Sequence, residues 1–296
     1  MNKARVIAFY LPQYHPIPEN DKYWGKGFTE WTNVAKAKPL FRGHYQPHIP
    51  ADLGFYDLRL PEVREAQAEL ARDAGIEGFC YYHYWFGNGK MLLQKPFEEV
   101  LRLGKPDFPF CLCWANHDWT TKTWVKGSSM VNNTMIAQQE YLGEQDDIKH
   151  FEYCLRAFKD HRYITIEGKP IFLIYDPLSF PNVKEFMNRW NFLAKKNNLK
   201  GIYFIGVTTG RQSSYKIVTN LGFDGVCHNR RWEAEAKAAG FRFVRRMQSL
   251  LGWHLGISLM KYDYNKVVRN YDTPENKLEN CYPVITPGFD RTPRAG

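Results

Sequence analysis

The stretch GFCYYHYWF occupies residues 78–86, and its first seven residues are the clearest strand in the chain. Aromatic side chains favour β-strands, because they pack well on a pleated surface. The stretch contains no Asp, Glu, Lys or Arg, which is typical of a parallel strand buried on both faces. We therefore predict a central parallel strand at Gly78–Tyr84.

Six further short apolar runs flank this strand, and helical patterns separate them. Alternating strands and helices are typical of parallel sheets with crossover helices, so the fold class is predicted as α/β, a (β/α)8 TIM-type barrel. Only nine residues follow the last run, so we expect the barrel to lack its eighth strand and helix. The six runs are Val6–Tyr10, Phe110–Ala115, Ile171–Tyr175, Ile202–Val207, Gly225–His228 and Val284–Pro287.

Residues 1–296 are expected to form a single (β/α)-barrel domain. Two long segments, 11–59 and 116–144, interrupt the alternation after the first and third strands. Loops at the carboxyl ends of barrel strands carry the site, so both loops are expected near it. A helix is also predicted from about Trp232 to Leu250.

Composition excludes several classes of protein. Hydrophobic residues make up 44% and charged residues 24% of the chain, as in ordinary globular domains. The net charge of +9 is scattered without a long basic run, so no nucleic-acid partner is predicted. The six cysteines form no C-x-x-C pair and the N-terminus has no apolar signal region, which favours a cytoplasmic protein with free thiols.

The first long loop contains a candidate catalytic carboxylate. Glu30 lies beside Trp31 in the run GFTEWTNV, and Tyr14 follows the first strand in the run LPQYHP. A glutamate near strand ends can act as an acid, a base or an acceptor for a sugar hydroxyl. The alternative is that Glu30 is only a solvated or capping residue.

The ends of the second and third strands combine aromatic and polar residues. His83 and Trp85 share one face of the second strand, and Tyr82 and Tyr84 share the other. After the third strand, two indoles bracket an amide, an imidazole and a carboxylate. Sugars stack on aromatic rings and bond to such polar groups, so this mixture favours a glycan site. These residues are Trp114, Asn116, His117, Asp118 and Trp119.

Later strand ends add further candidate substrate-binding residues, namely Asp176, His228, Asp290 and Arg291. Each alone has a structural alternative, such as a turn or a local ion pair. The histidines form no H-E-x-x-H spacing, and no phosphate-binding glycine motif is present. No metal and no cofactor are therefore predicted.

Several ordered runs resemble the WbsX-like family of polysaccharide biosynthesis proteins, also described as glycoside hydrolase family 99-like. They include FYLPQYHP (9–16), GFTEWTNV (27–34), PLFRGHYQP (39–47) and PGFDRTPR (287–294). The resemblance covers essentially the whole chain and implies a (β/α)8 barrel. It also implies a role in O-antigen or capsule biosynthesis, with an oligosaccharide or nucleotide-sugar substrate and membrane-peripheral partners in glycan assembly.

The chain departs from this family at two places. Family members carry Glu after the Trp-Ala-Asn at 114–116, where this chain has His117, and a C-terminal glutamate pair is absent. We therefore expect a glycosyltransferase or family 99-like glycoside hydrolase if the site is complete, with Glu30 and Asp118 as catalytic candidates. The alternatives are a non-catalytic glycan-binding domain, or a fragment without a stable fold. The oligomeric state is not implied.

Overall fold

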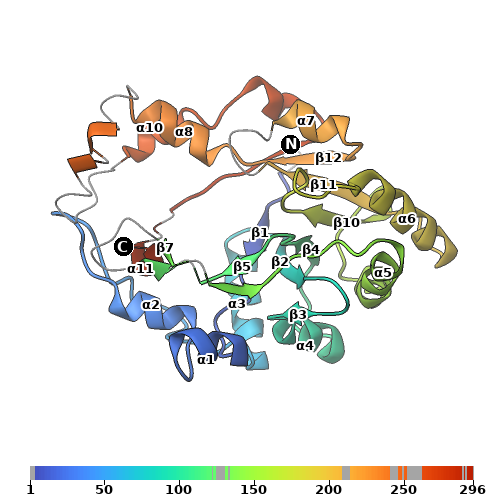
Figure 1. The fold of residues 1–296 in the computed structure, drawn as a ribbon, viewed down its shortest axis with the longest axis horizontal. Coiled ribbons are helices and arrows are strands. Elements are labelled where there is room, and N and C mark those ends of the chain that lie inside the picture. Colours follow the sequence, from blue (N-terminus) through green and yellow to red (C-terminus); the bar gives the residue numbers. More distant parts are fainter. Residues whose placement is uncertain are drawn as a thin grey trace.

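The computed structural model describes residues 4–121, 123–124, 131–132, 134–208, 214–240, 246–248, 250–251, 262–288, 290 and 292–295. Seven parallel strands lie in sequence order across one curved sheet (Figure 1). They are β1 (Ile7–Tyr10), β2 (Gly78–Trp85), β4 (Phe110–Trp114), β10 (Lys169–Ile174), β11 (Tyr203–Val207), β12 (Gly225–His228) and β13 (Cys281–Pro283).

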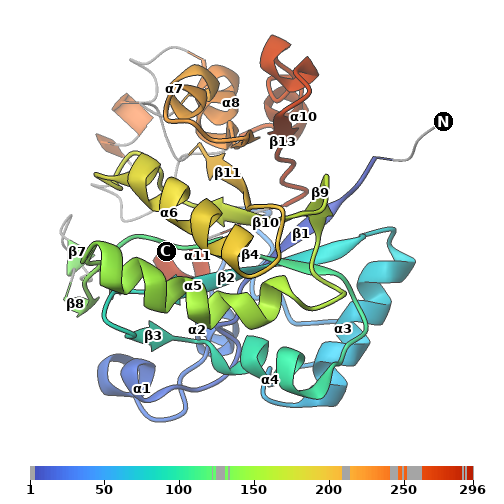
Figure 2. The ribbon, with the colours of Figure 1, turned by 90° about the vertical axis from the view of Figure 1, so that its right-hand side faces the viewer.

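Helices follow the strands and cover one face of the sheet (Figure 2). Pro61 and Pro96 lie in the first turns of two of them, where a missing N–H costs little. The helices are α3 (Pro61–Asp73), α4 (Lys95–Leu103), α5 (Glu144–Phe158), α6 (Val183–Lys196), α7 (Tyr215–Asn220), α8 (Arg231–Ala238) and α10 (Tyr264–Val268).

Short elements make up the loops at the carboxyl ends of the strands and the remaining turns. The first long loop contains α1 (Pro18–Trp24) and α2 (Glu30–Lys36), and the last described element is α11 (Thr292–Ala295). The others are η1 (Pro274–Lys277), β3 (Met91–Leu92), β5 (Trp119–Thr120), β6 (Thr123–Trp124), β7 (Val131–Asn132), β8 (Met135–Ala137) and β9 (Thr165–Ile166). No helix of the described residues combines the length and apolarity needed to cross a bilayer.

The core lies between the sheet and α5 and α6, and it is largely aromatic. Trp190 of α6 packs on Phe172 of β10 with ring centroids 4.7 Å apart, and on Phe186 at 4.6 Å. All three side chains are buried. Burial of each such ring contributes about 2–3 kcal/mol, so this layer fixes the position of the strands.

The predicted parallel strands are confirmed, and the last one is shifted. β13 pairs Cys281 with Val226 and ends at Pro283, whereas the predicted strand was Val284–Pro287. Pro283 and Pro287 have no N–H to donate to a ladder, so the run between them does not continue the sheet. The helix predicted to Leu250 is also wrong in its extent. α8 ends at Ala238, and Gly240 follows with a φ of 74°, a conformation that suits glycine after a helix.

The sheet is open between its first and last strands. β1 pairs with β2 and β13 pairs with β12, and within the described residues no strand joins β13 to β1. The fold is therefore α/β and corresponds to a (β/α)8-type barrel with seven of its parallel strands. The carboxyl ends of all seven strands lie at one end of the sheet, which we call the carboxyl-end face.

Candidate functional site

A row of aromatic rings crosses the inner side of the sheet at its carboxyl-end face. Phe9 of β1 stacks on Tyr82 of β2, with ring centroids 5.4 Å apart. Tyr82 contacts Tyr175, at the end of β10, at 5.9 Å, and Tyr175 contacts His117 at 5.4 Å. We call Phe9, Tyr82, Tyr175 and His117 the aromatic row. It connects three strands through the side of the sheet that the helices do not cover.

The tyrosines of this row keep their protons. Burial raises the pKa of Tyr82 and of Tyr175 above the ordinary value. Both side chains are nevertheless only half-buried, so part of each ring is accessible. A neutral phenol both donates and accepts hydrogen bonds and presents a flat ring, which are the two contacts that a sugar uses.

Two of the predicted aspartates lie around the row. Asp176 directly follows Tyr175, and its Oδ2 accepts a hydrogen bond of 2.7 Å from the Ser179 hydroxyl. Asp118 is exposed, and its Oδ1 accepts a hydrogen bond of 2.7 Å from the backbone N–H of Gln139. Asp176 therefore follows a member of the row directly in the chain, while the sugar-binding role of Asp176 and the catalytic role of Asp118 stay predictions.

Asn116 connects the ends of two strands. Its Nδ2 donates to the Tyr141 hydroxyl at 2.9 Å and to the backbone carbonyl of Asp176 at 2.7 Å. Its Oδ1 accepts from the backbone N–H of Asp176 at 2.7 Å. The side chain is 0% exposed, which leaves no surface for the predicted sugar contact. We therefore assign Asn116 to positioning Asp176 and Tyr175.

Glu30, the predicted catalytic glutamate, begins α2 and is buried. Thr29 caps this helix with its side chain, so Glu30 is not the capping residue. Its Oε1 forms an ion pair with Arg294 of α11, and Arg294 also donates to Gln13 Oε1 at 3.2 Å. Asn33 donates to the other carboxylate oxygen at 3.4 Å. The carboxylate is therefore engaged on both oxygens.

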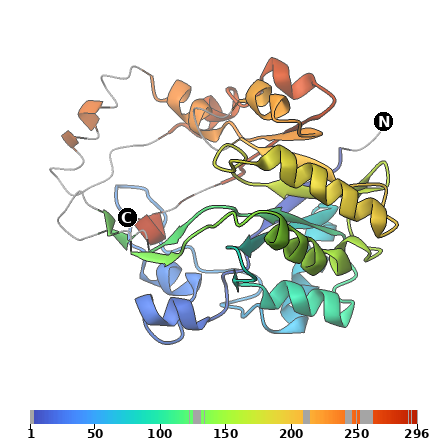
Figure 3. The same ribbon diagram turned by 45° about the vertical axis from the view of Figure 1, so that its right-hand side comes forward.

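The segment that contains Arg294 also attaches to the loop around residues 39–48. Asp290 Oδ2 lies 2.7 Å from His44 Nε2 and 2.7 Å from Gln46 Nε2. Although burial acts to raise it, hydrogen bonds from His44, Thr292 and Gln46 hold the pKa of Asp290 below its ordinary value. α11 consequently lies beside α2 (Figure 3). Arg291, the remaining predicted residue of this segment, lies outside the described residues.

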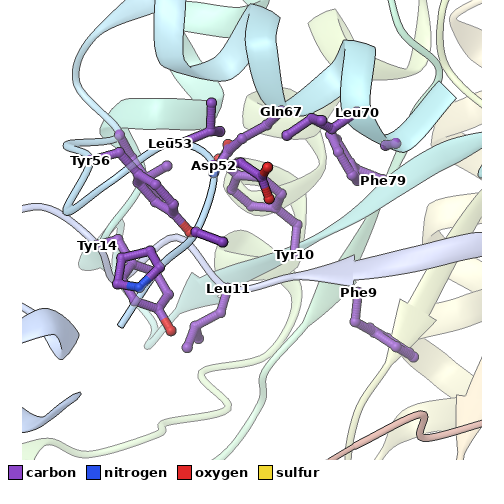
Figure 4. Close-up of a pocket in the computed structure, with 14 residues that line it drawn as sticks. Phe9, Tyr10, Leu11, Tyr14, Asp52, Leu53, Tyr56, Gln67, Leu70 and Phe79 are labelled. Atoms are coloured by element: carbon purple, nitrogen blue, oxygen red, sulfur yellow. The ribbon is translucent and has the colours of Figure 1, made fainter. Parts of the chain in front are cut away.

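Tyr14 and Trp31 pack together in the first long loop. Their ring centroids are 4.6 Å apart, and Trp31 Nε1 donates to the Tyr56 carbonyl at 2.8 Å. Tyr14 also lines a cavity of about 580 Å³ between β1 and α3. Figure 4 shows Tyr10 on the α3 side of β1 and Phe9 on the opposite side. The cavity therefore lies mainly at the helix-covered side of the sheet, and Phe9 is the member of the aromatic row that also lines it.

His83, Trp85 and Trp114 point away from the aromatic row, into the layer between sheet and helices. His83 Nε2 lies 2.8 Å from His150 Nε2, and burial lowers the pKa of His83 to about 3. Trp114 Nε1 donates to the Trp85 carbonyl at 2.9 Å. All three side chains are buried, so the structure does not bring these predicted sugar-binding residues together with the row.

Trp119 and His228 are not members of the row, although Trp119 stacks on Tyr84 with ring centroids 6.0 Å apart. Trp119 packs in a small cluster with Phe86 and Leu92 under the loop after β4. His228 is buried at the end of β12, where its Nδ1 lies 3.3 Å from Asn276 Oδ1. Burial lowers the pKa of His228, so a neutral ring is favoured.

His83 and His150 form, together with Cys154, a group of potential metal ligands. Within the described residues, their ligand atoms lie within 4.8 Å of one another. The 2.8 Å distance between the two Nε2 atoms is a hydrogen-bond distance. One Nε2–H therefore donates to the other Nε2, so each of these two nitrogens has a partner in the other ring.

Several residues of the carboxyl-end face were absent from the sequence-based set. Phe9, Tyr82, Gln13 and Arg294 were missed, although the alternation along 78–85 separates Tyr82 from His83. The alternation assigns these residues to two faces of β2, but the sequence does not show which of the two faces the helices cover. The pairing of Arg294 with Glu30 joins residues 264 positions apart, for which the sequence has no local signal.

Two curated proteins are similar to this chain in sequence. The chain is 34% identical to the uncharacterized protein WxcX of Xanthomonas campestris pv. campestris strains B100 and ATCC 33913, over 98% of this chain. It spans 39% of the length of these curated relatives.

Solved structures with a similar arrangement include the GH99 endo-alpha-mannosidase from Bacteroides thetaiotaomicron, at 16% identity. That similarity covers 85% of this chain and 66% of the mannosidase chain, with a TM-score of 0.45. A glycoside hydrolase-like protein is 15% identical over 84% of this chain and 67% of its own, with a TM-score of 0.46.

A family model described as Glycosyltransferase WbsX matches residues 6–296. The match includes every strand of the sheet and the segment that carries Arg294. The chain therefore belongs to the WbsX glycosyltransferase family of glycan-active proteins.

Proposed function

We propose that this chain binds a saccharide across the aromatic row, as part of a cytoplasmic enzyme that acts in cell-surface polysaccharide biosynthesis by glycosyl transfer or glycosidic cleavage. The observation that carries the proposal is the aromatic row itself. Accessible rings with neutral hydroxyls lie at the carboxyl ends of parallel strands, where barrel enzymes bind their substrates. Membership of the WbsX family supports a sugar as the ligand.

The contacts around the row suit a sugar ring. The faces of Tyr82 and Tyr175 can stack on its C–H groups, and their hydroxyls can bond to its oxygens. Asp176 can accept a bond from a sugar hydroxyl, because Ser179 donates to only one of its oxygens, Oδ2. Asn116 fixes the backbone of Asp176 and therefore holds this edge of the site in place.

Glu30 is the carboxylate that we propose for catalysis, with Asp118 as the second. Glycosidic chemistry needs two carboxyl groups on either side of the bond that reacts. Glu30 is paired with Arg294, so Arg294 has to release it, or bind substrate with it, before Glu30 acts on a sugar.

A non-catalytic glycan-binding domain is the second candidate function. The proposed catalytic carboxylate of Glu30 is engaged on both oxygens, by Arg294 and Asn33, whereas Asp118 is exposed and accepts one bond, from the Gln139 N–H, on Oδ1. This arrangement favours binding without turnover.

Binding of mannose-, rhamnose- and galactose-containing oligosaccharides, measured by calorimetry, tests the proposed site. Tyr82→Phe and Tyr175→Phe keep the rings and remove the hydroxyls, so each should weaken binding by roughly 1 kcal/mol. Tyr153→Phe is the matched control, because Tyr153 lies on α5 with its hydroxyl 3.3 Å from Glu98, on the helix-covered side. If Tyr82→Phe and Tyr175→Phe bound the oligosaccharides as tightly as Tyr153→Phe does, the proposed binding site would be rejected.

Turnover of the same oligosaccharides and of nucleotide-sugar donors separates the two candidate functions. For the enzyme, Glu30→Gln should remove turnover and keep saccharide binding. Binding with no turnover in the unaltered chain would support the binding domain instead.

A further inference from the structure

The cavity of about 580 Å³ between β1 and α3 is large enough to hold a ligand. Binding sites for small molecules in proteins have volumes of roughly 300–1,000 Å³, with walls that are mostly apolar and aromatic and carry a few polar groups. Figure 4 shows that the side chains around this cavity come from β1, from the loop before α3 and from α3 itself. The cavity therefore has the size and the enclosure of a small-molecule site.

Tyrosine side chains form much of the cavity wall. The rings of Tyr14 and Tyr56 lie with their centroids 5.5 Å apart, and the Tyr10 hydroxyl donates to Gln67 Oε1 at 2.6 Å. Burial raises the pKa of Tyr56 to about 12, so its phenol is neutral. The wall thus combines flat rings with neutral hydroxyl and amide groups, which are the kinds of group that bind sugars.

The charge of the wall distinguishes between classes of ligand. Asp52 is exposed, and it is the only Asp, Glu, Lys or Arg among the residues that line the cavity. Within the part of the chain that the structure describes, no residue forms a hydrogen bond or an ion pair with its carboxylate. A carboxylate repels phosphates and acidic sugars but accepts hydrogen bonds from hydroxyl groups. The wall therefore favours a neutral ligand that is rich in hydroxyl groups.

Phe9 connects the cavity with the aromatic row. Its ring stacks on Tyr82 with centroids 5.4 Å apart, and Phe9 also lines the cavity. No described strand pairs with the second edge of β1, so that edge is free. Phe9 and Leu11, within and directly after β1, are 37% and 36% exposed. An extended ligand on the row can therefore continue around β1 to the cavity.

From these features we infer that the cavity is a second saccharide subsite, which binds neutral sugar units of an oligosaccharide whose other units lie on the aromatic row. This second subsite rests on the proposed function, because both places bind the same ligand. Tyr14 and Tyr56 provide rings for stacking, while Asp52 and the Tyr56 hydroxyl provide hydrogen bonds. The chain is thus expected to bind long oligosaccharides more tightly than short ones.

Calorimetry with disaccharides and hexasaccharides of mannose, of rhamnose and of galactose tests the second subsite. The disaccharides serve as ligands for the aromatic row alone. We expect Asp52→Ala and Tyr56→Phe each to weaken hexasaccharide binding about fivefold and to leave disaccharide binding unchanged. Asp73→Ala is the matched control, because Asp73 is exposed at the end of α3 and does not line the cavity.

Two results would overturn the second subsite. One is that Asp52→Ala and Tyr56→Phe bind hexasaccharides as tightly as Asp73→Ala does. The other is that the unaltered chain binds hexasaccharides no more tightly than disaccharides. Tyr82→Phe separates this failure from a failure of the proposed function, since it should still weaken disaccharide binding when only the cavity is unoccupied. If no saccharide binds to the unaltered chain, both the proposed function and the second subsite are wrong.

Discussion

Replacing Asn116 by alanine tests whether this buried amide holds two strand ends together. The change removes the donors to Tyr141 and to the Asp176 carbonyl, and the acceptor for the Asp176 N–H. A fourth bond, from the Tyr141 hydroxyl to the backbone carbonyl of Asn116, survives because alanine keeps that carbonyl. The substitution therefore isolates the side-chain contribution.

The size of the effect follows from the number of bonds lost. Each neutral hydrogen bond contributes about 1 kcal/mol net, so the three lost bonds predict a decrease of about 3 kcal/mol in the free energy of unfolding. Water cannot readily replace the amide, because the site is 0% exposed.

Urea denaturation followed by far-ultraviolet circular dichroism measures this change. Asn265→Ala is the matched control, because Asn265 is exposed on α10, and it should change the free energy of unfolding by less than about 0.5 kcal/mol. A loss below about 1 kcal/mol for Asn116→Ala would refute the positioning role. Weaker saccharide binding with unchanged stability would instead restore the predicted sugar contact.

Burial lowers the pKa of His15 from 6.5 to about 4, so its stabilising contribution is complete above pH 6.5 and is lost as the pH falls toward 4. His15→Phe should reduce the pH dependence of the free energy of unfolding in this range, to which the lowered pKa values of His83 and His228 also contribute, and an unchanged pH dependence would exclude a contribution from His15. All six cysteines are free and buried, and burial raises the pKa of Cys154. Ellman's reagent should therefore find no fast thiol in the folded chain and six in urea, whereas one fast thiol in the folded chain would contradict the structure.

The strands could be predicted because each is a short apolar run with a helix after it. The last strand was predicted at Val284–Pro287 instead of at 281–283, because Val284 and Ile285 are more apolar than the residues of β13 that pair with β12. Ile285 is in fact 75% exposed. Prolines on both sides prevent this run from joining the ladder.

The site was only partly predictable, since a barrel strand is buried on both faces. In β2, His83 and Trp85 pack under helices while Tyr82 and Tyr84 face inward, yet all four are apolar or aromatic enough for either side. Hydrophobicity alone therefore does not show which of the two faces lies under the helices. The choice depends on where the helices pack, which is a property of the whole sheet.

The C-terminal segment meets the first long loop, and this contact determines what Glu30 can do. Asp290 attaches to His44 and Gln46, and four residues later Arg294 pairs with Glu30. The Arg294 side chain is 43% exposed, so water also solvates its charge, and the Glu30 carboxylate, at 11%, is the more buried partner of the pair. A substrate that draws Glu30 away has to supply another acceptor for Arg294. A carboxylate or a phosphate would replace Glu30 as a charged acceptor, whereas sugar hydroxyls and Gln13 Oε1 are neutral acceptors, so we predict that a charged substrate separates the Glu30–Arg294 pair more readily than a neutral glycan.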